Sequence, residues 1–228
     1  MSCTSLTSGF AGRLTPQARA RLLALGMLGR FQPGDCLLRE SERSDHVLLL
    51  VQGRVKVTST AVNGYAAVLG IRGPGDLLGE LAGLDGNPRS ATVTALDPVL
   101  ARSISGPEFH RFIGTHPGAG IALAELIASR LRAANQRRLE FAAFPVRRRL
   151  ALILLDLERW YGVNALGDPD HRDIDLALSQ LDLAGLVGSS LEAVAKAIRS
   201  FAREGIVRIR RRRVTILDRS ALAEIAGE

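Results

Sequence analysis

Short apolar runs separated by glycine-containing turns fill the chain from about residue 30 to residue 104. Clear examples are residues 46–51, 54–58 and 67–71, and the pair Asn63-Gly64 between the last two is a hairpin signal. Strands at spacings of about ten residues predict an antiparallel sandwich or barrel. Before them, residues 16–28 have the three-to-four-residue periodicity of a helix.

From Pro117 the apolar period changes to that of a long helix. The pattern predicts a helix of about 25 residues that ends near Phe144-Pro145. Its apolar stripe must pack either on its own β domain or on a second copy in a parallel dimer seam, and the pattern leaves both open. The stripe consists of Leu123, Ile127, Leu131, Ala134 and Phe141, with Arg138 as its one charged member.

After Pro145 the pattern predicts a mainly helical C-terminal part. We expect an α+β protein with an antiparallel β domain and N-terminal helix over residues 1–116, a central helix over 117–144, and a helix-turn-helix domain over 145–228. Within the last part we expect a helix at 147–160, a polar loop at 162–175, helices at 178–186 and 190–203, and a hairpin of 206–209 with 214–217 joined through Arg210 to Arg213.

Composition restricts the class of protein. Of the 228 residues, 46% are hydrophobic and 23% charged, which is typical of a soluble globular protein. No apolar run reaches the ~18 residues of a membrane span, and the N-terminus lacks the pattern of a signal peptide. Cys3 and Cys36 are too few for a disulfide framework or a cysteine-ligated cluster. We therefore expect a cytoplasmic protein without a membrane association.

The net charge of +7 is concentrated near the C-terminus. Residues 187–219 hold nine Lys/Arg against three Asp/Glu. Such a surplus indicates either a polyanion as partner or a solvated charged surface.

The segment LSQLDLAGLVGSSLEAVAKAIRSFAREG has the layout of a helix-turn-helix. Ser179 with Asp182 resembles a capping box, Gly188 supplies the tight turn, and Ser189 or Ser190 caps the second helix. Leu183, Leu186, Val187, Val194, Ile198 and Phe201 then form the buried face.

Four residues are left pointing outward near the start of the second helix, where this motif enters the major groove of DNA: Leu191, Glu192, Lys196 and Arg199. Glu192 can accept from a cytosine amino group or can cap Ser189. Lys196 can donate to guanine or to phosphate, and Leu191 offers apolar contact, for instance to a thymine methyl. Arg208 and the run Arg210 to Arg213, within the terminal hairpin and including Arg211 and Arg212, would form a basic wing against the DNA backbone; the alternative is a solvated turn.

The stretch GELAGLDGNPRSATV, residues 79–93, places Glu80 and Arg89 among small apolar residues. Two readings are open: a structural ion pair between the two side chains, or a site for a ligand that needs an acceptor and a positive charge.

The whole chain resembles the CRP/FNR superfamily of bacterial transcription factors. The resemblance rests on the order of RFQPGDCLLRE, LLLVQGRVKVTS, IRGPGDLLGELAGLDGNPRSATV, the long helix and LAGLVGSSLEAVAKAIRSFAREGIV. It implies an N-terminal cyclic-nucleotide-binding β-roll that senses an effector, a dimerising central helix and a C-terminal winged helix-turn-helix that binds DNA.

By this resemblance residues 79–93 look like the phosphate-binding cassette of cyclic-nucleotide domains. Arg89 would grip the cyclic phosphate bidentately, and backbone N–H groups near Gly79, Leu81 and Ser90 would add donors. Glu80 would accept from the ribose 2′-hydroxyl. Glu80 bonded to Arg89 without any ligand remains the alternative.

The sequence departs from the family pattern at two sites. Two adjacent hydroxyl residues meet the adenine edge in cyclic-AMP-responsive members, and the aligned positions here are Ala134 and Asn135. The frequent Ser-Arg-Glu…Arg of the recognition helix reads Ser190-Leu191-Glu192…Lys196, so the operator should differ from the best-known consensus.

Cyclic AMP is the first choice of effector, with cyclic GMP, another ligand or an empty pocket as alternatives, and we expect no covalent cofactor. Two cysteines cannot hold an iron–sulfur cluster, and the four histidines show no haem pairing signal. The sequence shows no nucleophile–base pair, so we do not expect an enzyme.

We expect a homodimer on a near-palindromic double-stranded operator with half-sites about 34 Å apart. RNA polymerase is a further expected partner, and Phe144-Pro145 the expected hinge.

Overall fold

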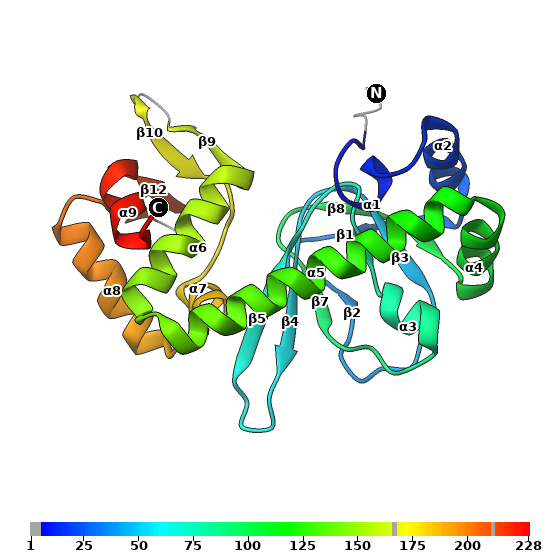
Figure 1. Cartoon of the computed structure of the whole chain (residues 1–228), viewed down its shortest axis with the longest axis horizontal. Coiled ribbons are helices and arrows are strands. Elements are labelled where there is room, and N and C mark those ends of the chain that lie inside the picture. Colours follow the sequence, from blue (N-terminus) through cyan, green and yellow to red (C-terminus); the bar gives the residue numbers. More distant parts are fainter. Residues whose placement is uncertain (1–5, 166–167, 211–212) are drawn as a thin grey trace. The chain divides into compact units, whose positions relative to one another are not determined.

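The structure is a computed structural model that describes residues 6–165, 168–210 and 213–228. Its contacts divide the chain into two units, one ending at Ala134 and the other beginning at Asn135. The division falls within the long helix α5 (Pro117–Ala143), so that helix contributes to both units (Figure 1).

The first unit contains two four-stranded sheets, and every strand pair in them is antiparallel, as the sequence predicted. The first sheet has the order β1 (Met27–Phe31), β8 (Val99–Ile104), β3 (Val47–Gln52) and β6 (Leu77–Leu78). The second has the order β2 (Cys36–Leu38), β7 (Thr92–Ala95), β4 (Val55–Thr60) and β5 (Ala66–Arg72). The predicted Asn63-Gly64 turn joins β4 to β5, with Gly64 at φ 82°.

Strand β3 explains why its sequence is apolar throughout rather than alternating. Successive side chains of a strand point to opposite faces. Leu48 and Leu50 lie in the core shared with the second sheet, whereas Val47 and Leu49 lie in the core under the helices. Those helices are α1 (Gly9–Gly12), α2 (Pro16–Ala24), α4 (Gly106–Thr115) and the first part of α5.

The predicted helix over residues 16–28 is too long. Helix α2 ends at Ala24, and the chain enters β1 at Met27. Gly26 adopts φ 60° between them, and a Cβ at this position would lie 2.0 Å from the carbonyl oxygen of Ser103. The close backbone approach therefore ends the helix and requires a glycine.

Helix α5 has the predicted start and end, and its apolar stripe divides into two parts. Leu123 is buried and Ile127 packs against the same core, so this part packs on its own β domain. Of the later stripe members, Leu131 is 59% and Phe141 44% exposed, and Leu139, which lies off the stripe, is 65% exposed. This later part of α5 leaves apolar side chains available for the predicted dimer seam.

The second unit surrounds the buried side chains of Leu150, Leu154 and Phe201. The predicted polar loop at 162–175 is wrong, because this segment forms two strands that extend a sheet of order β11-β12-β10-β9. Its helices are α6 (Val146–Tyr161), α7 (Gln180–Val187), α8 (Leu191–Arg203) and α9 (Arg219–Ala226). Its strands are β9 (Gly162–Ala165), β10 (Asp168–Ile174), β11 (Val207–Arg210) and β12 (Arg213–Ile216).

Candidate functional site

The 79–93 segment connects the two sheets of the first unit, from the end of β6 to the start of β7. Its first part is the short helix α3 (Glu80–Asp85), which begins after Gly79 in the left-handed conformation (φ 73°). A Cβ on Gly79 would lie 2.3 Å from Nη1 of Arg89. The glycine therefore allows both the turn and the close approach of the guanidinium to the backbone.

Arg89 is buried, with 3% of its surface exposed, and is wrapped by the loop before β3. Its guanidinium donates from Nε to Ser44 Oγ (3.0 Å), from Nη1 to the Gly79 carbonyl (2.8 Å) and from Nη2 to the His46 carbonyl (2.6 Å). All three acceptors are neutral. Within the described part of the chain, no carboxylate forms an ion pair with Arg89.

Electrostatics agree with this picture of a buried cation among neutral acceptors. Burial lowers the pKa of Arg89 from its ordinary value, and the more distant charges of Asp45, Glu42 and Glu80 oppose that shift. A guanidinium nevertheless stays protonated in proteins. The site therefore holds a desolvated positive charge, which is costly unless a counter-charge comes close.

Glu80, only 6% exposed, is not paired with Arg89, so the alternative of a structural ion pair between these two residues is wrong. Its Oε1 accepts instead from Nη1 of Arg130 at 2.7 Å, and Nη2 of Arg130 donates to the Leu77 carbonyl at 2.8 Å. Arg130 lies on α5, in the first unit. The described residues show no hydrogen bond to the second carboxylate oxygen of Glu80, which leaves an acceptor at the start of α3.

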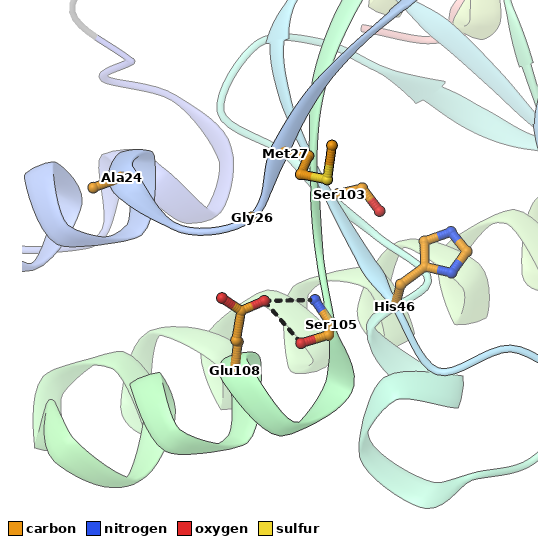
Figure 2. Close-up of a pocket in the computed structure, with 7 residues that line it drawn as sticks. All are labelled: Ala24, Gly26, Met27, His46, Ser103, Ser105 and Glu108. Atoms are coloured by element: carbon orange, nitrogen blue, oxygen red, sulfur yellow. Dashed lines mark hydrogen bonds between the residues drawn. The ribbon is translucent and has the colours of Figure 1, made fainter.

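His46 is close to Arg89 and also lines a cavity of about 550 Å³ in the first unit. Its Nδ1 is 3.4 Å from Nη2 of Arg89, and burial followed by the charge of Arg89 lowers its pKa from the usual 6.5. Figure 2 shows His46 and Glu108 on different sides of the cavity, with Glu108 accepting hydrogen bonds from Ser105. The lining residues are Ala24, Gly26, Met27, His46, Ser103, Ser105 and Glu108, none of them from the 79–93 segment.

The other predicted ligand-site residues are solvent-accessible. Leu81 is 43% exposed on α3, and Ser90, directly after Arg89, is exposed as well. Ala134 and Asn135 are exposed on α5, at the last position of the first unit and the first of the second. That Ala134 and Asn135 contact the base of a bound nucleotide stays a prediction.

The helix-turn-helix of the second unit forms as predicted. Ser179 and Asp182 make a capping box at the start of α7, with aspartate in place of the usual glutamate, and Gly188 turns the chain at φ 65°. Of the two candidate caps for α8 the structure selects Ser190, whose hydroxyl accepts from the Ala193 N–H at 3.2 Å. Ser189 instead donates its backbone N–H to the Ala184 carbonyl.

The outward face of α8 carries the predicted reading residues. Leu191, Glu192, Lys196 and Arg199 are exposed. The described residues show no hydrogen bond to the Glu192 carboxylate, so it does not cap Ser189. Arg208 and Arg210 are exposed on β11. Nη1 of Arg213, the last predicted wing residue, lies 3.5 Å from Oδ2 of Asp173 on β10. Arg211 and Arg212, also predicted for the wing, lie outside the described residues.

Metal-ligand clusters and membrane-spanning helices are absent from the described ranges. No group of three or more His, Cys, Asp or Glu side chains there is arranged to hold a metal ion. No described helix is long and apolar enough to cross a bilayer. Sequence reasoning missed Ser44, His46 and Arg130 as site residues. Nothing distinguishes Arg130 from the other arginines on the polar faces of the long helix.

Comparisons with known proteins agree with this geometry. A family model of the cyclic nucleotide-binding domain matches residues 28–116, and a model of the Crp-like helix-turn-helix domain matches residues 148–225. The chain is 32% identical over 196 residues to the CRP-like cAMP-activated global transcriptional regulator of Mycobacterium tuberculosis, covering 86% of each chain. It is 30% identical over 207 residues to the cyclic AMP receptor protein of Thermus thermophilus, covering 90% of this chain and 91% of that one.

Solved structures of similar proteins share the fold. A CRP/FNR-family transcriptional regulator from Thermus thermophilus matches with a TM-score of 0.69 and 25% identity, over 89% of this chain and 99% of that one. The c-di-GMP-responsive global regulator CLP of Xanthomonas campestris matches with a TM-score of 0.79 at 20% identity, over 90% of this chain and all of that one. The relatives that span most of the chain are regulators and not enzymes. The chain belongs to the CRP/FNR family of DNA-binding transcription regulators.

Proposed function

We propose that a cyclic nucleotide, with cyclic AMP as the first choice, binds at the 79–93 segment and controls DNA binding by the second unit. The observation that carries this proposal is the buried Arg89 guanidinium, which has only neutral acceptors around it. A guanidinium has five N–H donors, and three of them make these short bonds. The cyclic phosphate monoanion would supply the missing counter-charge through charge-assisted hydrogen bonds.

Glu80 supports a nucleotide rather than a simple anion. Arg130 pairs with Glu80 at 2.7 Å and lies 3.9 Å from Asp76, which limits the repulsion that the Glu80 carboxylate would exert on a nearby anion. The second oxygen of Glu80 can accept from a ribose 2′-hydroxyl, a group that inorganic phosphate lacks. A ligand that carries both a phosphate and a sugar hydroxyl therefore fits the pair Arg89 and Glu80.

The choice of cyclic AMP follows from the relatives. Two relatives that are at least 30% identical over most of the chain are named for cyclic AMP. The c-di-GMP-responsive protein is only 20% identical. Ala134 lacks the side-chain hydroxyl that the resemblance associates with adenine, whereas Asn135 can donate and accept. Selectivity between adenine and guanine is therefore a matter for direct titration.

On the DNA side we infer a homodimer that places two α8 helices in successive major grooves of a near-palindromic operator. Leu191, Glu192, Lys196 and Arg199 would face the groove, with Ser189 and Ser190 near the backbone at its edge. Half-sites would lie about 34 Å apart. RNA polymerase is the expected further partner.

Isothermal titration calorimetry with cyclic AMP and cyclic GMP tests the effector proposal. Wild-type protein should bind one of them, and Arg89→Lys should lose binding because an ammonium keeps the charge without the guanidinium fork. Arg102→Lys is the matched control: it makes the same change at an arginine of the same unit whose Nη1 donates to the carbonyls of Leu25 and Gly26. Full affinity in Arg89→Lys, or no heat with either nucleotide, would contradict the proposal and favour a regulator with an empty or altered pocket.

A further inference from the structure

The turn between α7 and α8 is held from outside the helix-turn-helix. Val187 ends α7 and Gly188 makes the turn, two residues before the Ser190 cap of the helix that carries the DNA-facing residues. Side chains that bind Val187 and Gly188 from outside the helix-turn-helix therefore fix the orientation of α8.

Arg149 on α6 binds both residues. Its Nη1 donates to the carbonyl oxygens of Val187 at 2.7 Å and of Gly188 at 3.0 Å. Both carbonyls lie at the C-terminal end of α7, where a positive charge is also favoured by the helix dipole. The guanidinium thus fastens the end of α7 to α6.

Phe141, near the end of α5, completes the contact. The guanidinium carbon of Arg149 lies 5.3 Å from the centre of the Phe141 ring, within the range of a cation–π interaction. A Cβ on Gly188 would lie 2.8 Å from the same ring, so the aromatic edge packs directly on the turn. Arg137, one turn earlier on α5, reaches the Leu186 carbonyl at 3.4 Å.

The chain between α5 and α6 is fastened as well. Phe144 continues the helical hydrogen bonding to Glu140, and the guanidinium of Arg148 lies 3.8 Å from the centre of the Phe144 ring. Nε of Arg148 donates to the Ala226 carbonyl at the end of α9. Phe144-Pro145, the hinge expected from the sequence, therefore sits among contacts within the second unit.

We propose that Phe141 and Arg149 are positioning residues that lock the end of α5 to the turn before the DNA-reading helix, so that this end of α5 and α8 move as one piece. Flexing between the effector-binding unit and the DNA-binding unit then occurs within α5, before Arg137, rather than at Phe144-Pro145. The lock itself needs no effector. Only its role in regulation rests on the proposed function.

Hydrogen–deuterium exchange on the full-length protein without ligand or DNA tests the lock. Arg149→Met should increase amide exchange both in residues 137–143 and in residues 186–190, while residues 117–130 stay unchanged. Arg148→Met, the neighbouring arginine that bonds to α9, should leave residues 186–190 unchanged. Unaltered exchange in 186–190 for Arg149→Met overturns the proposal. Phe141→Leu, which keeps an apolar side chain, should give the same pattern if Arg149→Met is too unstable to measure.

Operator binding with and without cyclic AMP tests the regulatory role, using a sequence selected from random DNA. In Arg149→Met and Phe141→Leu the ratio of the two affinities should fall several-fold, while binding of cyclic AMP to the free protein stays at the wild-type level. A merely structural role would weaken DNA binding equally in both conditions and leave the ratio intact, which would refute the coupling. If wild-type DNA binding ignores cyclic AMP, the proposed effector is wrong, and the exchange experiment still decides on the lock.

Discussion

At the scale of single residues, the site depends on how one buried guanidinium is held. The sequence predicted that Arg89 would be central, because a lone arginine in a small, apolar segment needs an anion or an acid nearby. It did not predict that neutral groups from the loop before β3 surround Arg89, or that Glu80 pairs with Arg130. Both contacts join residues more than forty positions apart, and no local pattern encodes them.

Gly79 offers a test with an internal control. Gly79→Ala should displace the Arg89 guanidinium and abolish nucleotide binding, because the new Cβ would lie 2.3 Å from Nη1. Gly86, at the other end of α3, has nearly the same φ (70° against 73°) but nothing within 4 Å of its Cβ position. Gly86→Ala should therefore carry the same backbone strain, about 1–2 kcal/mol, and still bind. Calorimetric titration distinguishes them, and equal affinity in the two variants would count against the role of Gly79.

His46 makes the stability of the first unit depend on pH. Burial and the nearby Arg89 lower its pKa below 6.5 in the folded state, so the unfolded chain binds the proton more readily. Stability should therefore fall as the pH drops from about 7 to below the unfolded pKa, and should be regained on raising the pH. His46→Gln should flatten this part of the curve of Tm against pH. An unchanged slope in the variant would show that other groups are responsible.

At the scale of elements, the second unit presents a helix with two separable faces. Val194, Ile198 and Phe201 are buried, while the face with Glu192, Lys196 and Arg199 is exposed. The amphipathic pattern predicted both faces, because helical periodicity is a local property of the sequence. The function of the exposed face follows from its chemistry and from the family.

Lys196→Ala should weaken operator binding, since a contact to phosphate or guanine is lost. For a phosphate contact the slope of log affinity against log salt should fall by about 1. Arg203→Ala, in the last turn of the same helix, is the control, because it removes one positive charge away from the groove-facing end. Gel-shift or anisotropy titrations over a range of salt concentrations provide the measurement. Equal losses in the two variants would mean that only net charge matters.

The elements that sequence reasoning missed share a physical cause. Strands β9 and β10 contain Asn, Asp, Pro and Gly, which disfavour strands, and they form because β10 pairs with β12 and Arg172 bonds to Glu158 on α6. Helix α2 stops early because Gly26 packs against the backbone of β8. By contrast, β3, β4, β5, α5 and α8 were predictable, since their periodicity or turn signals are local.

At the scale of the whole molecule, α5 belongs to both units and carries exposed apolar residues along its later part. Isolated exposed leucines are ordinary, but Leu131 and Leu139 lie on the helix that the resemblance identifies as the dimer seam. A homodimer would bury them and bring two reading helices to one operator.

Leu131→Asp should convert the dimer to a monomer, because two like charges would face each other in an apolar seam. Val62→Asp adds the same charge at a fully exposed apolar position in the β4–β5 turn and should leave the dimer intact. Sedimentation equilibrium gives the mass of each. If the wild-type protein is a monomer, or if Leu131→Asp dimerises with the same affinity as the wild type, Leu131 does not lie in a dimer interface.

The central claim is that a cyclic nucleotide held by Arg89 controls binding of DNA by α8. The most direct test is the affinity for a selected operator as a function of cyclic AMP concentration, in wild-type protein and in Arg89→Lys. We predict that saturating cyclic AMP raises the wild-type affinity by about tenfold or more, within the usual range of allosteric coupling, and leaves Arg89→Lys unchanged. The same response to cyclic AMP in both proteins, or no response in either, would contradict the account.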